Sequence, residues 1–243
     1  MRAWIFARRN AKEILRDPLS FAFWLGFPIV LLLLLTAIQS SVPVALFELH
    51  HLTPGICIFG LSFLTLFSAT IISKDRKSTF LLRLYATPMK PLDYIIGYTL
   101  PILPIAILQS VACYGVAAIL GLKITVYTLC AVLGVAVVSV LYIAMGLLFG
   151  SILNEKQVGG VCGALLTNLS AWLSGIWFDI ELIGGVFTKI CNALPFLHAV
   201  ELLRAVLNGN FAGIFPHLWW VLGYSIAVFG LAVWLFLRQM KRK

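Results

Sequence analysis

The chain has 243 residues, of which 61% are hydrophobic and only 11% are charged, and its formal net charge is +9. A soluble domain normally carries about a quarter charged residues, so this composition excludes an ordinary water-soluble fold and predicts an integral membrane protein. The basic residues lie between apolar runs, next to presumed membrane surfaces. The positive charge therefore indicates topology and contact with anionic headgroups rather than nucleic-acid binding.

The N-terminal segment, residues 1–18, predicts an amphipathic helix that lies in the membrane interface. One face carries Arg2, Arg8, Arg9, Lys12 and Arg16, and the other carries Ala3, Trp4, Ala7, Ala11, Ile14 and Leu15. Ile5 and Phe6 interrupt this pattern. Asp17 and Pro18 are expected to end the helix, because the residue before a proline disfavours helical geometry. The apolar run that follows has the length of a membrane span and is too long for a signal-peptide core.

Six charge-free runs have the length of about 20 residues that a helix needs to cross a bilayer. They are Leu19–Ser40, Leu52–Ser73, Tyr94–Leu120, Thr125–Leu153, Val158–Phe178 and Phe215–Leu237. The sequence therefore predicts an all-α integral membrane protein with six transmembrane helices, forming a single transmembrane domain over residues 1–243.

The distribution of Lys and Arg predicts the orientation of these spans. With the N-terminus in the cytoplasm, 15 of the 18 Lys and Arg residues fall on the cytoplasmic side. Cytoplasmic loops of membrane proteins carry an excess of these residues. Both termini are therefore expected in the cytoplasm, which requires an even number of spans.

Two connections between the spans are longer than the others. Residues 74–93 form a basic cytoplasmic loop, in which a short helix is predicted over Phe80–Tyr85 and is stopped by Thr87 and Pro88. Its apolar side chains need a cover, which either lipid or a partner protein can provide. Residues 179–210 hold an apolar stretch, Leu182–Leu194, that is too short to cross the bilayer, and they predict two short re-entrant helices on the outside.

Several kinds of chemistry are missing from the sequence. There is no phosphate-binding G-x-x-x-x-G-K-[ST] loop, no G-x-S-x-G and no H-E-x-x-H, and the five cysteines lack zinc-site spacing. The spans hold almost no ionisable residue, which disfavours an ion-coupled carrier. The chain is therefore expected to be no enzyme, and any energy for transport has to come from another chain.

Glycine pairs and polar residues mark the fourth and fifth spans. Gly146 and Gly150 form one G-x-x-x-G pair, and Gly159 and Gly163 form another. Such pairs let helices approach closely, and packing within one subunit is favoured over a dimer contact. Asn168 is the best single candidate for a pathway residue, although simple interhelical hydrogen bonding explains it equally well.

Three segments carry a resemblance to a known family. Residues 74–88 (KDRKSTFLLRLYATP) resemble the cytoplasmic loop of type-2 ABC exporter permeases, in which a charged cluster, a Leu-rich turn and Thr-Pro lead into the third span. Residues 173–179 (LSGIWFD) and 194–204 (LPFLHAVELLR) look like two further patches of the same family, in the same order. The chain departs from the family pattern at Ser78, where glycine is usual, and at Tyr98, where lysine is common.

The resemblance implies a function for each region. It implies a membrane-spanning subunit that pairs with a second copy or a paralogue and with two ABC-type ATPase subunits, which hold ATP and Mg²⁺, so that this chain needs no cofactor. The residues implied in ATPase coupling are Lys74, Asp75, Arg76, Thr79, Phe80, Leu81, Arg83, Leu84, Tyr85, Thr87 and Pro88 in the loop, with Arg8, Arg9 and Lys12 in the N-terminal helix. The residues implied in the substrate pathway are Ser62, Thr65, Phe67, Thr167, Asn168, Trp172 and Ser174. The residues implied in an extracellular gate are Pro195, His198, Glu201 and Arg204.

The leading hypothesis is thus an ABC exporter permease of a bacterial or archaeal cytoplasmic membrane that moves a hydrophobic or amphiphilic substrate outward. Two alternatives stay open. One is a membrane scaffold or assembly protein, which has no need for a loop that binds an ATPase. The other is an ion-coupled carrier or channel, which predicts a charged constellation at mid-membrane.

Overall fold

The structure is a computed structural model that describes residues 2–41, 47–78 and 89–240, and all the secondary structure in these ranges is helical. Five helical stretches are long and apolar enough to cross a membrane, and the number rises to six if one bent pair of helices counts as a single span. The predicted fold class, an all-α multi-pass membrane protein, is confirmed.

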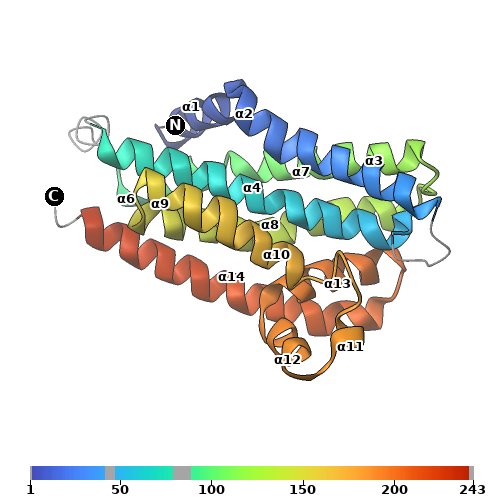
Figure 1. The fold of residues 1–243 in the computed structure, drawn as a ribbon. Coiled ribbons are helices and arrows are strands. Elements are labelled where there is room, and N and C mark those ends of the chain that lie inside the picture. Colours follow the sequence, from blue (N-terminus) through green and yellow to red (C-terminus); the bar gives the residue numbers. More distant parts are fainter. Residues whose placement is uncertain (1, 42–46, 79–88, 241–243) are drawn as a thin grey trace.

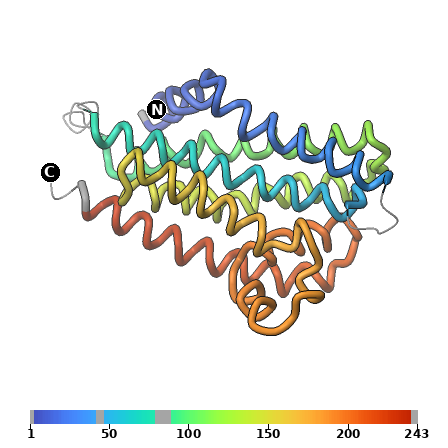
Figure 2. Tube along the Cα trace, viewed as in Figure 1, coloured from blue at the N-terminus to red at the C-terminus, as the bar shows by residue number. Residues whose placement is uncertain are grey.

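The long helices run side by side along one axis (Figures 1 and 2). In chain order they are α1 (Arg2–Arg16), α2 (Pro18–Phe21), the π-helical η1 (Ala22–Gly26), α3 (Phe27–Gln39), α4 (Leu49–Lys77), α6 (Pro91–Thr99), α7 (Ile102–Ile119), α8 (Val126–Ile152), α9 (Glu155–Val158), the π-helical η2 (Gly159–Leu166), α10 (Thr167–Trp172), α11 (Ile180–Ile183), α12 (Gly185–Ala193), α13 (Pro195–Leu207) and α14 (Phe211–Met240). We call the end that holds α1 and the last turns of α4 and α14 the terminal end. The opposite end, where α11, α12 and α13 gather, is the far end (Figure 1).

Helix α4 is the most buried of the spans and packs closely against α8. A Cβ atom on Gly150 of α8 would lie 2.7 Å from the Cβ atom of Ile72, and one on Gly146 would lie 2.9 Å from the Oγ atom of Ser68. This G-x-x-x-G pair therefore serves packing within the chain, as expected. The second pair differs, because Gly159 has open space where a Cβ atom would lie.

Replacing Gly150 with alanine is expected to lower the unfolding free energy by about 1–3 kcal/mol, because the added methyl group forces α8 away from α4. Thermal unfolding of the detergent-purified protein measures this loss. The matched control is Gly159→Ala, whose added methyl group enters open space and should leave the midpoint nearly unchanged. Equal midpoints for the two variants would contradict this account of the α4–α8 contact.

Two of the predicted spans are longer or more broken than expected. Helix α4 continues to Lys77, so the last four residues of this helix, which were expected in a loop, are helical. The third span begins at Pro91 and is divided into α6 and α7 at Leu100 and Pro101, since proline lacks the N–H that a continuous helix would use.

The fifth expected span differs most from its prediction. It was expected over Val158–Phe178, but the helical stretch formed by α9, η2 and α10 covers Glu155–Trp172 and is not among the five that qualify as spans. Its start is three residues early because Asn154 and Gln157 cap each other reciprocally. It ends early at a turn in which Gly175 has a φ of +69°, a backbone conformation that favours glycine.

At the far end, α12 and α13 form a helix pair bent by 76°. The residue between them, Leu194, is extended, and Pro195 opens α13 at a position where proline fits a helix. Two short helices were expected here, and the structure adds a third, α11, which is capped by the Asp179 carboxylate.

Candidate functional site

At the terminal end, α1 lies on α6 through a narrow face. Phe6 is buried against Gly97, where any Cβ atom would overlap the ring, and it meets Tyr94 and Tyr98 edge to face. The side-chain amide of Asn10 donates to the carbonyl oxygen of Gly97 at 2.8 Å. The expected apolar face of this helix was therefore partly wrong. Phe6, which was expected to interrupt the amphipathic pattern, lies in the hydrophobic core.

One buried carboxylate joins three elements at this end. Asp75, in the last turn of α4, is only 4% exposed. It accepts two hydrogen bonds from the guanidinium of Arg9 in α1, at 2.5 and 3.0 Å, and a third from the hydroxyl of Tyr98 in α6, at 3.0 Å. Bidentate Arg–carboxylate pairs are among the strongest polar contacts in proteins. The Asp75 cluster, made of Arg9, Asp75 and Tyr98, thus ties α1 and α6 to the end of α4.

The neighbours of Asp75 are also engaged within the chain. Arg76 donates to the carbonyl oxygens of Gly150 at 3.2 Å and Leu153 at 3.1 Å. These carbonyls belong to the C-terminal end of α8, where they lack helical partners and attract positive charge. Lys74 lies 3.9 Å from the Glu155 carboxylate, an exposed pair that contributes little. Asp75 and Arg76 therefore anchor the end of α4 to α1, α6 and α8.

The other residues implied in ATPase coupling fall into two groups. Arg8 and Lys12 are exposed on α1. The remaining ones lie outside the described residues: Thr79, Phe80, Leu81, Arg83, Leu84, Tyr85, Thr87 and Pro88. The Asp75 cluster lies at the point where the chain enters this segment.

The seven residues implied in a substrate pathway separate into an inner and an outer set. Four are buried and donate to helix carbonyls, namely Ser62, Thr65, Thr167 and Ser174. The hydroxyl of Thr167 reaches the carbonyl oxygen five residues back, which the π-helical η2 leaves accessible. Phe67 is half-buried. Asn168 and Trp172 are exposed on α10, and the Asn168 amide donates to the Ala164 carbonyl of its own helix.

At the far end, Arg204 is a buried cation that connects three segments. It is 5% exposed, and it donates to the carbonyl oxygen of His51 at 3.1 Å, the carbonyl oxygen of Gly175 at 3.0 Å and the carboxylate of Glu201 at 2.7 Å. It thereby holds α13 against the first turn of α4 and against the turn that follows α10.

A second polar contact at this end joins α13 to α14. The Nδ1 atoms of His198 and His217 are 2.8 Å apart, and the Nε2 atom of His198 is 2.9 Å from the carbonyl oxygen of Asn192. Since a carbonyl only accepts, His198 donates through Nε2 and its Nδ1 atom accepts from His217.

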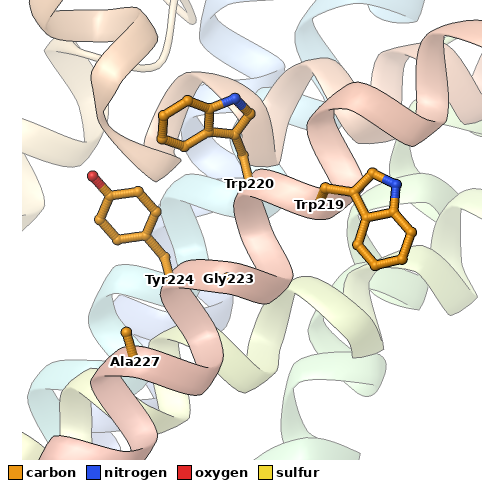
Figure 3. Close-up of a pocket in the computed structure, with 5 residues that line it drawn as sticks. All are labelled: Trp219, Trp220, Gly223, Tyr224 and Ala227. Carbon is orange, nitrogen blue, oxygen red and sulfur yellow. The ribbon is translucent and has the colours of Figure 1, made fainter.

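Aromatic rings surround this histidine pair. The ring of His198 stacks on Trp220 at a centroid distance of 5.0 Å, and the Tyr224 hydroxyl donates to the carbonyl oxygen of Ala193 at 2.7 Å. Figure 3 shows Trp220 and Tyr224 on one side of α14, with Trp219 pointing away on the other side and Gly223 between them. These four residues and Ala227 line an open groove of about 390 Å³. Tryptophan and tyrosine at one level are typical of a membrane–water boundary.

A polar cavity of about 640 Å³ lies between these far-end elements. Arg204 and His217 line it together with four carboxylates, those of Glu48, Asp179, Glu181 and Glu201. In the described part of the chain, no group of three or more His, Cys, Asp or Glu side chains is placed to hold a metal ion. Of the four residues implied in a gate, Glu201 and Arg204 line this cavity. His198 contacts the lining residue His217, and Pro195 begins the helix that carries all three.

The comparison with protein families gives one match that covers most of this architecture. The model described as ABC-2 type transporter matches residues 1–208. The chain belongs to the ABC-2 type transporter family. A comparison with curated proteins found no match. The family resemblance inferred from the residues is confirmed, and it identifies the chain as an ABC-2 membrane transport subunit, a kind of protein that normally works with an ABC ATPase.

Within this ABC-2 subunit, the sequence reasoning missed several partners of the residues that it named. It did not connect Tyr98 with Asp75, although Tyr98 was noted as a departure from the family pattern. It did not place Asn10, although Phe6, Asn10 and Ile14 follow a spacing of four residues that marks one helix face. It treated His217 as flanking the outer segment, and no local signal pairs it with His198.

Proposed function

We propose that this ABC-2 subunit is the membrane-spanning permease of an ATP-driven exporter that moves a hydrophobic or amphiphilic substrate outward. A separate ABC ATPase subunit would hold ATP and Mg²⁺ and supply the energy. The observation that carries the proposal is the Asp75 cluster. It connects α1 and α6 to the end of α4, where the chain enters residues 79–88. A force that the ATPase exerts on residues 79–88 would therefore move α1, α4 and α6 together.

The orientation of the subunit is part of the proposal. We place the terminal end, with both chain termini, in the cytoplasm of a bacterial or archaeal cell. The charge distribution supports this, because 15 of the 18 Lys and Arg residues fall in the segments that the sequence assigns to the cytoplasmic side. The far-end cavity would then face outward and act as part of an extracellular gate.

We further propose that a second copy or a paralogue meets the exposed face of η2 and α10. Asn168 is exposed beside Trp172 on a face whose other exposed side chains are apolar, and its amide nitrogen bonds only within its own helix. A polar amide facing lipid gains from a further partner on another subunit. Substrate would pass between the two subunits near this face, so that these side chains would contact it.

Replacing Asn168 with leucine is expected to reduce transport several-fold while leaving the unfolding midpoint unchanged, because the amide bonds only to its own helix. Efflux from inverted vesicles that contain the permease and its ATPase measures the first effect, and thermal unfolding measures the second. Thr167→Val is the control inside the core, and it should lower the midpoint. Full transport by Asn168→Leu would remove this residue from the pathway.

The test of the proposed function is co-purification of the tagged chain from native membranes, followed by an ATPase assay. A stoichiometric ABC ATPase with vanadate-sensitive hydrolysis is the expected result. A homo-oligomer without an ATPase, both in mild detergent and in nanodiscs, would favour the scaffold or the carrier instead.

A pair of variants sharpens this experiment. Phe80→Asp in the predicted coupling segment should abolish association with the ATPase and leave membrane insertion intact. Leu182→Asp introduces the same charge at an exposed position of the far end and should leave association unchanged. Equal association of both variants would contradict the proposed role of residues 79–88.

A further inference from the structure

The outward side of α1 carries a row of uncompensated positive charge. Arg8, Lys12 and Arg16 follow one another at intervals of four residues, and all three are exposed. None of them belongs to an ion pair within the described residues. The acid nearest to them on the helix, Glu13, is bound by Arg9 at 2.8 Å. We call Arg8, Lys12 and Arg16 the basic stripe.

The basic stripe lies at the level where the first span begins. Helix α1 ends at Arg16, and Asp17 directly caps α2 by accepting from the backbone N–H groups of Leu19 and Ser20. The span that starts at Pro18 presents exposed apolar side chains at once, those of Leu19 and Phe21. Only one residue separates the stripe from this span, so its charges lie close to the boundary between headgroups and hydrocarbon.

Apolar side chains flank the stripe and are not used by the fold. Trp4 is 66% exposed, and Leu15, about three turns farther along α1 on the same side, is also exposed. Tryptophan favours the membrane interface, where its ring lies among the headgroups. An acidic protein surface would match the stripe but would leave these side chains in water. A lipid matches both, because its phosphate meets the basic residues and its acyl chains meet Trp4 and Leu15.

We infer that the basic stripe binds the phosphate headgroup of an anionic phospholipid in the leaflet at the terminal end. A shallow groove of about 440 Å³ runs along this side of α1 and is lined by Arg8, Arg9, Lys12 and Arg16 together with Ile5 and Glu13. Guanidinium groups match phosphate oxygens in pairs, and basic residues near a membrane surface each add to the attraction of anionic lipid. The bound lipid would hold α1 at the membrane, while Arg9 on the inner face of α1 binds Asp75.

The test uses the full chain alone, purified in a neutral detergent and titrated with phosphatidylglycerol or phosphatidylcholine under native mass spectrometry. Phosphatidylglycerol is expected to bind more tightly, and raising the salt concentration should weaken it. The stripe variant Arg8→Gln/Lys12→Gln/Arg16→Gln should lose this preference by about tenfold or more. The matched control Lys123→Gln/Lys189→Gln removes exposed charges from the far end and should keep the preference.

Two results would overturn the inference. One is equal binding of the two lipids by the unmodified chain. The other is an undiminished preference for phosphatidylglycerol in the stripe variant. If that variant also fails to retain the ATPase, the stripe is a protein-docking surface. Since the lipid titration contains no ATPase, its outcome is independent of whether the proposed exporter function holds.

Discussion

Replacing Asp75 with asparagine is expected to lower the unfolding free energy by about 1–3 kcal/mol and to separate α1 from the end of α4. Removing one partner of a buried ion pair is strongly destabilising, and the loss is smaller here because the Arg9 side chain is 37% exposed and partly screened by water. An asparagine amide would also turn an N–H donor toward the Arg9 guanidinium, which has no acceptor to offer. Denaturant unfolding in detergent measures the stability. Cysteine cross-linking between α1 and α4 measures the separation.

The controls for this prediction come from the same cluster. Glu13→Gln removes a half-exposed partner of Arg9 and should change the stability by less than about 1 kcal/mol. Tyr98→Phe removes the hydroxyl that donates to Asp75 and should cost about 1 kcal/mol. An Asp75→Asn variant as stable as Glu13→Gln would show that the cluster does not hold α1 in place.

The sequence predicts the helices of this fold well, because the length of an apolar run and the spacing of charges are local properties. It places the end of α4 too early for a physical reason. Lys74, Asp75 and Arg76 read as a charged loop. They stay helical because Arg9 and Tyr98 bind Asp75 and the carbonyl oxygens of α8 accept from Arg76. Such partners are distant in sequence, so the hydropathy pattern around residues 74–76 cannot predict them.

The fifth helix was harder to predict for a different reason. The π-helical geometry of Gly159–Leu166 changes which residues share a face, and a period of 3.6 residues does not reveal it. The break at Pro101 was not predicted either, although a proline inside an apolar run is a local signal for such a break. For the far-end site, the sequence selected Arg204 and Glu201, and the structure supplied the carbonyls of His51 and Gly175, which lie 153 and 29 residues from Arg204.

Replacing Arg204 with methionine is expected to have the largest effect on stability, a loss of about 3–5 kcal/mol. The variant removes the side-chain donor from the carbonyl oxygens of His51 and Gly175 and the cation from the Glu201 carboxylate. Each buried polar group left unsatisfied costs about 1–3 kcal/mol. Arg204→Lys keeps the charge but lacks the planar fork that reaches three acceptors, so it should recover only part of the loss.

The sites at which Arg204→Met loses stability show whether Arg204 holds α13 locally against α4 or stabilises the whole helix bundle. Hydrogen exchange in Arg204→Met should accelerate in the first turn of α4 and in the turn around Gly175, while α8 and the terminal end keep their protection. The control His51→Ala retains the backbone carbonyl that Arg204 uses, and its exchange should match that of the unmodified protein. Two outcomes would show that Arg204 does not hold α13 against α4. One is faster exchange throughout the chain in Arg204→Met, and the other is faster exchange at the same two sites in His51→Ala. Confined acceleration would mean that the far end can open while the bundle below it stays folded, as an extracellular gate requires.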